Sequence, residues 1–297
     1  MSHPNVDLPP RFDLRIAALL GHASRLVYEN PLERGTDIAS QLGMSEISFF
    51  DLDETQAFVA ANDDLVVVAF RGTEPTTLAD WITDLSLDLM RGPLGGEVHS
   101  GFYDSLSNIW CDFDDEVRRL QSRKSRPVYV TGHSLGGAMA NLAVARWVEM
   151  RRPVHALYTF GQPRAGDKVF SLNFDFVFKT ATFRFVNRCD IVTRVPPRAL
   201  GYRHTGTLKY FNDAGELVEG ITWWRQFMQR WHGGIERIFD WCGHGFGDHS
   251  MVKYCEFLDR AVAQERPTLA LRMRSVGEAP TPQAGFHDLM TPRRRAA

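Results

Sequence analysis

The sequence is poor in cysteine and has no excess of charge of either sign. Its four cysteines among 297 residues include no Cys-x-x-Cys pair, and we expect ordinary reduced thiols, as in a cytosolic protein; they are Cys111, Cys189, Cys242 and Cys255. The 34 basic residues nearly balance the 36 acidic ones, which leaves a formal net charge of -2. No global field therefore draws the chain to polyanions, and we expect no nucleic-acid partner.

Long apolar runs are also missing. No run approaches the ~18 residues that a membrane span needs, and the stretch from Met1 to Pro10 lacks the basic and apolar regions of a secretory signal. We therefore expect a cytoplasmic protein, which a peripheral contact with a membrane would still allow. Composition leaves the oligomeric state open.

The chain does have enough apolar residues for one sizeable core, because hydrophobic residues make up 44% of it. Short apolar runs typical of buried strands alternate with longer runs that have helical spacing. The strand runs are 65–73, 128–132, 154–160 and 182–187, and the helical runs are 11–29, 101–121 and 135–150. Strands that alternate with helices favour an α/β fold with a largely parallel central sheet.

The C-terminal third is less regular. Residues 212–215 are typical of a hairpin turn, and a helix is expected from Ser250 to about Ala263. Beyond Pro267 the sequence is rich in Pro, Gly and Arg without periodicity, which indicates a loosely ordered tail. We therefore expect one domain over residues 1–266 and a tail over residues 267–297.

The stretch VYVTGHSLGGAMANLAVA, residues 128 to 145, contains a Gly-x-Ser-x-Gly pattern between an expected strand and an expected helix. A sharp turn at this junction strains the backbone at Ser134, and side chains two positions away would collide. Gly132 and Gly136 remove those atoms, while His133 and Leu135 flank the serine. The turn is therefore predicted to present Ser134 as a nucleophile; an ordinary glycine turn that happens to contain serine is the alternative.

A serine hydroxyl needs a histidine to take its proton and a carboxylate to orient that histidine. His249 precedes an expected helix in a glycine-rich loop, which favours it as the base; His244 and then His232 are the alternatives. Asp190 directly follows an apolar strand, so its carboxylate is expected at the same edge of the sheet as the serine. We therefore predict a triad of Ser134, Asp190 and His249.

Six blocks between about Ala17 and Leu258 resemble the class 3 lipases, a family of fungal triacylglycerol lipases and their plant and bacterial relatives. In chain order they are VVVAFRGT, VHSGFYDSL, VTGHSLGGAMANLA, TFGQPRAGD, FRFVNRCDIVTRVPP and DHSMVKY. The resemblance implies an α/β-hydrolase fold with Ser134 as nucleophile, Asp190 as acid and His249 as base. It also implies an oxyanion hole formed by the backbone amides of Leu135 and Thr73.

Residues between Thr73 and the VHSGFYDSL block carry an amphipathic helical pattern. Its apolar positions are Leu78, Trp81, Ile82 and Leu85. The resembled family has a mobile lid at this place, which covers the serine in water and opens at a lipid surface. A helix packed permanently on the core has the same pattern, so the two interpretations stay open.

A tryptophan-rich segment, residues 221–241, departs from the compact fungal pattern and resembles two short amphipathic helices. One apolar stripe consists of Trp224, Phe227, Met228 and Trp231. Aromatic residues beside arginines suit the wall of an acyl pocket or a bilayer interface, whereas ordinary core burial gives the same spacing. Because the segment precedes His249, we expect it to border the active site.

Cys242, His244, Asp248 and His249 are close in sequence, but their spacing matches no zinc pattern, and we expect neither a metal nor a cofactor. We predict a serine carboxylic ester hydrolase of lipid degradation, acting as a lipase on acylglycerols and touching a lipid interface transiently. A phospholipase A1 or a small-ester esterase would share the triad. A catalytically silent lipid-binding protein is the non-enzymatic alternative.

Overall fold

The computed structural model describes residues 10–29, 31–53, 55–73, 78–84, 86–218 and 245–277. In this part of the chain, one eight-stranded sheet forms the centre, in the order β1-β2-β3-β6-β7-β8-β9-β10. The strands are β1 (Glu46–Leu52), β2 (Thr55–Ala61), β3 (Val66–Phe70), β6 (Val128–His133), β7 (Ala156–Phe160), β8 (Thr182–Asn187), β9 (Thr207–Phe211) and β10 (Leu217–Val218). A second sheet pairs β4 (Leu89–Arg91) with β5 (Glu97–His99).

The five strands from β3 to β9 run parallel, and antiparallel hairpins extend the sheet at both edges. The expected α/β fold with a largely parallel sheet is thus confirmed. The carboxyl ends of all the parallel strands lie along one edge of the sheet, where the chain continues into the segments after Phe70, His133, Phe160 and Asn187. Open α/β sheets bind ligands at this edge.

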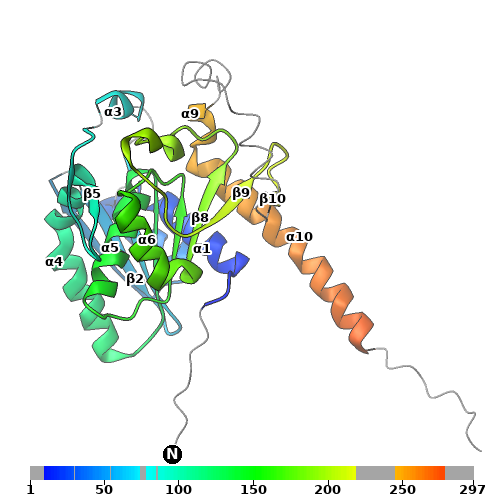
Figure 1. Cartoon of the computed structure of the whole chain (residues 1–297). Helices are drawn as coiled ribbons and strands as arrows, with labels where there is room; N and C mark the ends of the chain where they lie inside the picture. The colour runs from blue at the N-terminus through cyan, green and yellow to red at the C-terminus, as the bar shows by residue number, and fades with distance from the viewer. Residues whose placement is uncertain are drawn as a thin grey trace, which may run out of the picture.

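Helices cover both faces of the sheet (Figure 1). On one face, α4 (Ser100–Arg123) and α5 (Leu135–Glu149) pack on a core that includes Val66, Val68 and Phe70. On the other, α1 (Leu14–Leu26) and α10 (Met251–Gly277) pack on a core that includes Val67 and Ala69. Successive β3 residues thus alternate between the two cores, as strand geometry requires.

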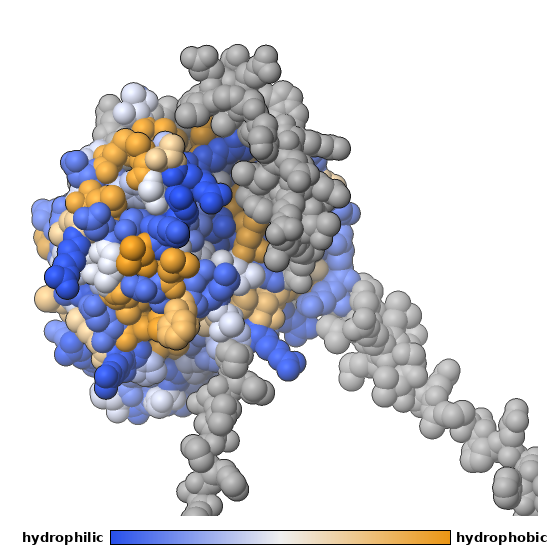
Figure 2. All heavy atoms as spheres, viewed as in Figure 1, coloured by the Kyte–Doolittle hydropathy of each residue, from blue (hydrophilic) through white to orange (hydrophobic). Residues whose placement is uncertain are grey.

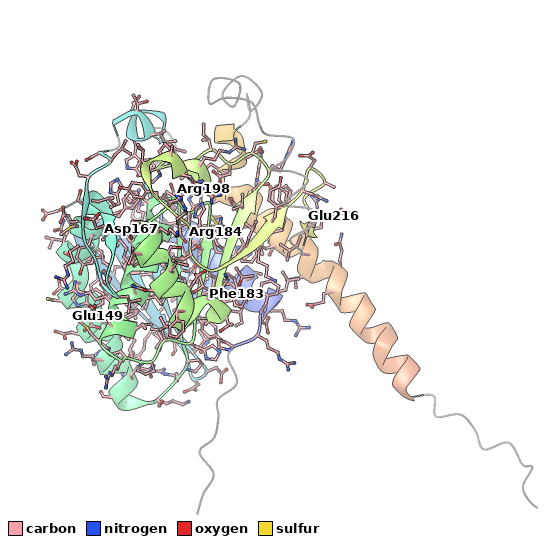
Figure 3. All side chains as sticks on the ribbon, in the orientation of Figure 1. Glu149, Asp167, Phe183, Arg184, Arg198 and Glu216 are labelled. Carbon is pink, nitrogen blue, oxygen red and sulfur yellow. The ribbon has the colours of Figure 1, made fainter. Side chains whose placement is uncertain are left out.

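The described body also contains α2 (Pro31–Leu42), next to α1, and α6 (Lys168–Phe178), which follows β7 and precedes β8 in the chain. Asp167, labelled in Figure 3, caps α6 by accepting a hydrogen bond from the Phe170 amide at 2.7 Å. The outer side of α6 is apolar and exposed, which gives the hydrophobic patch over this helix in Figure 2.

The C-terminal helix is longer than expected. The sequence pattern predicts its end near Ala263 and a loose tail from Pro267, but α10 continues to Gly277 and leaves the body as a single rod (Figure 1). A proline inside a helix costs about 3 kcal/mol, and its neighbours here are mostly strong helix formers such as Ala, Leu, Arg and Met. Among the described helices, none has the length and apolar character needed to cross a membrane.

Candidate active site

Ser134 occupies the turn between β6 and α5, and its backbone has a positive φ (φ 57°, ψ -132°). A Cβ atom on Gly132 would come within 2.2 Å of the Gly136 carbonyl oxygen, and one on Gly136 within 2.2 Å of the Phe70 carbonyl oxygen. These approaches are far too short for any side chain, so the two glycines make the strained turn possible. The serine is the N-cap residue of α5, and the amino end of this helix carries a partial positive charge.

Asp190 and His249 form a buried pair at the same edge of the sheet. His249 Nδ1 lies 2.9 Å from each carboxylate oxygen of Asp190, and the two residues are 3% and 1% exposed, respectively. A carboxylate only accepts hydrogen bonds, so Nδ1 carries the ring proton and donates a hydrogen bond to Asp190. Nε2 is therefore the basic nitrogen of His249.

Two buried atoms of the predicted triad have no hydrogen-bond partner in the described part of the chain, namely Ser134 Oγ and His249 Nε2. A buried polar group without a partner costs about 1–3 kcal/mol and calls for an explanation. The neighbour of the serine, His133, packs its ring against that of His249, with centroids 4.3 Å apart. The unpartnered hydroxyl and the basic nitrogen thus belong to residues of one compact cluster.

Tyr254 of α10 is a site residue that the sequence patterns did not single out. Its hydroxyl donates to Asp190 Oδ2 at 2.8 Å and accepts from the Asn187 amide at 2.8 Å. Burial, and then the Asp190 charge, raise the pKa of Tyr254 well above its usual value, so the phenol stays neutral and can donate. The Val192 amide also donates to Asp190, at 3.0 Å to Oδ1. These bonds hold the carboxylate toward His249.

The segment after β3 lies against the serine turn. A Cβ atom on Gly72 would come within 3.0 Å of the Ser134 Cβ atom and 2.5 Å of the His133 carbonyl oxygen. Thr73 follows Gly72, and Leu135 follows the serine as the first residue of α5. Both expected oxyanion donors therefore sit in segments that adjoin Ser134.

The expected lid pattern forms a short helix, α3 (Leu78–Asp84). Leu78 is 2% exposed and packs on Ile191 and Val192, directly after Asp190, together with Trp81 and Ile82. The Trp81 ring also stacks on Phe102, with centroids 6.1 Å apart. Leu85, the fourth residue of the predicted apolar face, lies outside the described residues.

The strand that leads to Asp190 also carries a buried cation, Arg184, which is labelled in Figure 3. Burial lowers the pKa of its guanidinium to about 10, against the opposing attraction of Tyr254 and Asp175. Arg184 therefore stays charged at neutral pH and adds positive potential beneath the site.

Several predicted residues fall outside the described part of the chain. They are the proposed pocket residues Trp224, Phe227, Met228 and Trp231, the alternative bases His232 and His244, and Cys242. Among the described residues, no group of His, Cys, Asp and Glu is arranged to hold a metal ion. Of the described cysteines, Cys111 is exposed, Cys189 is half-buried and Cys255 is buried, and no disulfide joins any two of them.

Comparison with known proteins agrees with the blocks found in the sequence. A family model described as lipase (class 3) matches residues 67–200. A lipase of Rhizomucor miehei is 35% identical over 183 residues, which cover 57% of this chain and 48% of that protein. The chain thus spans about half the length of the curated relatives it matches.

Solved structures agree as well. The triacylglyceride lipase of Rhizomucor miehei superposes with a TM-score of 0.61 at 28% identity, covering 68% of this chain and 81% of that one. A triacylglycerol lipase whose catalytic centre is described as a serine protease triad has the same TM-score and identity, with 67% and 80% covered.

Proposed function

We propose that this chain is a serine carboxylic ester hydrolase, because a model of the class 3 lipase family matches residues 67–200 and the fold is that of an α/β-hydrolase. The buried Asp190–His249 pair beside the strained Ser134 turn carries the proposal. The pair fixes the histidine tautomer with Nε2 free, which is the nitrogen a serine hydroxyl needs as its base.

The reaction has two halves. Ser134 Oγ attacks the ester carbonyl carbon while its proton passes to His249 Nε2, and the resulting oxyanion accepts hydrogen bonds from the Thr73 and Leu135 amides. His249 then gives the proton to the departing alcohol, which leaves an acyl group on Ser134. A water molecule, deprotonated by the same nitrogen, attacks this acyl-enzyme and releases the carboxylic acid and the free serine.

We propose acylglycerols as the substrates and a lipid interface as the place of action. Two observations support this choice. The similar solved enzymes act, by their names, on triacylglycerides. In addition, α3 covers the segment after Asp190 with an apolar face, and uncovering such a face costs free energy that a lipid surface would offset.

Replacing the nucleophile tests the reaction class. We expect Ser134→Ala to lower kcat for p-nitrophenyl butyrate by at least about 10⁴-fold, since mutations of triad members in serine hydrolases reach this range. A fluorophosphonate probe should label the wild-type chain and not the variant. Ser107→Ala, which removes an exposed hydroxyl on α4, is the matched control and should keep the full rate. A Ser134→Ala protein with undiminished activity would refute the triad.

The substrate class needs a separate measurement. Rates for tributyrin below and above its solubility limit should rise sharply once droplets form, as expected of a lipase with a lid. A rate that follows only the dissolved concentration would instead indicate an esterase for small soluble esters. Release of fatty acid from phosphatidylcholine vesicles, but not from triacylglycerol, would indicate a phospholipase A1.

A further inference from the structure

His133 stands next to the nucleophile, and the reaction described above gives it no task. The side chain is 3% exposed. Burial, and then the neighbouring His249, hold the pKa of His133 well below its usual value, so the ring is neutral at physiological pH. A neutral imidazole has one donor and one acceptor nitrogen, and both of them are used here.

The proton position on His133 follows from its partners. Nε2 lies 2.7 Å from the carbonyl oxygen of His249, which can only accept, so Nε2 carries the proton and donates. Nδ1 is then the acceptor, and it lies 3.0 Å from the hydroxyl of Tyr28, just after α1. Tyr28 therefore donates to His133, which donates in turn to the backbone of the predicted catalytic base.

The same tyrosine reaches the expected oxyanion loop. Gly72, which precedes Thr73, lies against its hydroxyl oxygen: a Cβ atom at Gly72 would fall 2.6 Å from that oxygen, so only glycine allows this approach. Burial raises the pKa of Tyr28 above its usual value, and the phenol keeps the proton that it donates to His133. Tyr28 thus contacts the backbone of Gly72 and is joined by hydrogen bonds, through His133, to His249.

We propose that Tyr28 and His133 are positioning residues, which join the oxyanion loop, the nucleophile turn and the backbone of the catalytic histidine into one unit, through the contact with Gly72 and two hydrogen bonds. The inference rests on the proposed ester hydrolase function. These three segments come from distant parts of the chain, and displacing one by about 1 Å can cost 10²-fold in rate. Hydrogen bonds in series also polarise one another, which strengthens each bond of the series.

The neutrality of His133 belongs to this role. The ring of His133 faces Tyr28, His249 and Tyr254. The nearest charged groups are Arg71, which lies over the Tyr28 ring, and Asp190, which is hydrogen-bonded to His249. His249 becomes positively charged while it holds the serine proton. A second cation at His133 would repel that charge across the 4.3 Å between the ring centroids. A neutral His133 avoids this repulsion and leaves Nδ1 free to accept from Tyr28.

The test compares two tyrosine variants in the full chain. Tyr28→Phe removes only the hydroxyl, and we expect kcat for p-nitrophenyl butyrate to fall about tenfold, as for the loss of one hydrogen bond between buried groups, with KM within about twofold of wild type. Tyr158→Phe is the control, since it also removes a hydroxyl, which accepts from the backbone amide of Asp13. This control should keep the wild-type kcat.

A spectroscopic readout tests the hydrogen bonds of Tyr28 and His133 without relying on activity. In ¹⁵N-resolved histidine spectra of the wild type, His133 should be in the form protonated at Nε2, and the Nδ1 resonance should shift in Tyr28→Phe. A wild-type His133 protonated at Nδ1 would overturn the proposed direction of the bonds. Equal kcat losses in the two tyrosine variants, or none in Tyr28→Phe, would overturn the positioning role.

A second variant covers the case in which Tyr28→Phe does not fold. His133→Gln keeps an amide N–H that can reach the His249 carbonyl, so it should retain at least about tenfold more activity than His133→Ala. Equal losses in these two variants count against the proposal. Failure of the wild type to hydrolyse esters, or to react with a fluorophosphonate, would instead refute the proposed function, and the spectra would still report on the hydrogen-bond chain.

Discussion

Gly161, like the glycines of the nucleophile turn, leaves room for a catalytic group that any side chain would displace. It follows β7 with φ 57°, and a Cβ atom there would come within 2.7 Å of Asp190 Oδ2 and 2.8 Å of His249 Nδ1. The Asp190–His249 pair thus lies directly on the bare backbone of Gly161. Any side chain at this position must push the acid or the base away from its place.

We expect Gly161→Ala to lower kcat by about 10²-fold, because it displaces two groups whose alignment sets the rate. Gly43→Ala is the matched control: Gly43 has a similar φ of 66°, but an added Cβ would meet nothing within 4 Å. Both variants introduce backbone strain of about 1–2 kcal/mol, so both should lower the Tm. Ester hydrolysis at matched folded fractions separates the two, and similar kcat values for Gly161→Ala and wild type would contradict the contact.

The site residues that the sequence predicts lie in short, recognisable sequence patterns, whereas those that it misses do not. Ser134 lies in a five-residue pattern with two glycines, and Asp190 and His249 lie in blocks that resemble a family. Tyr28 and Tyr254 have no such local signal, because their partners lie 105 and 64 positions away in the chain. Only the fold brings these pairs together. Gly161 lies inside one of the quoted blocks, yet its contact with the acid and the base depends on how β7, β8 and the segment after α9 are placed in the fold.

At the level of elements, α3 is where the two interpretations of the apolar lid pattern can be tested. Leu78 is 2% exposed, and it packs on Ile191 and Val192 rather than on the main cores. Trp81 adds a contact with Phe102 of α4. These apolar contacts suit a helix that detaches at a lipid surface, and a helix that never moves would make the same contacts.

We expect Leu78→Ser to raise the hydrolysis of a dissolved short-chain ester, measured below its solubility limit. Removing about 1.4 kcal/mol of packing from the closed form increases the open fraction about tenfold while the closed form predominates. Leu87→Ser, at an exposed leucine just after α3, is the control and should leave the rate unchanged. A lower Tm without any gain in rate would show that α3 is a permanent part of the core.

Most central elements could be predicted, and the peripheral ones could not, for a physical reason. The parallel strands are buried on both faces, so β3, β6, β7 and β8 read as apolar runs. In contrast, β1 is a half-exposed edge strand that pairs with β2 across a tight turn, and acidic residues interrupt its pattern. The sequence pattern also misses the helix α2, because the proline that follows the helical run 11–29 is typical of the end of a helix, whereas Pro31 begins a new one.

For the whole molecule, one edge of the sheet gathers every described residue assigned to the reaction. Ser134, Asp190 and His249 follow β6, β8 and α9 (Gly245–Asp248), and Thr73 follows β3. The family resemblance predicted this assembly, because the order of parallel strands places their carboxyl ends side by side. Cytoplasmic localisation stays a prediction, and so does a pocket built by Trp224 and its neighbours, which lie outside the described residues.

The extent of the catalytic domain can be tested at α10. Among its side chains whose burial is described, those up to Glu265, the last buried one is Leu258. Asp259 and Arg260 make hydrogen bonds to the body, with His22 and the Ala214 carbonyl oxygen. A chain that ends at Glu265 keeps all these contacts. We therefore expect its Tm to stay within about 4 °C of that of the full chain, as for changes away from the core, and its kcat to be unchanged.

A chain that ends at Glu256 provides the contrast, because it loses Leu258, which is fully buried, together with both hydrogen bonds. Burial of one leucine side chain contributes about 1.5–3 kcal/mol, so this shorter chain should melt several degrees lower. Loss of α10 contacts also loosens Tyr254, whose hydroxyl holds Asp190, so kcat should fall along with stability. If the chain ending at Glu265 behaves like the shorter one, the domain does not end at residue 266, and the last residues of the chain contribute to the catalytic body.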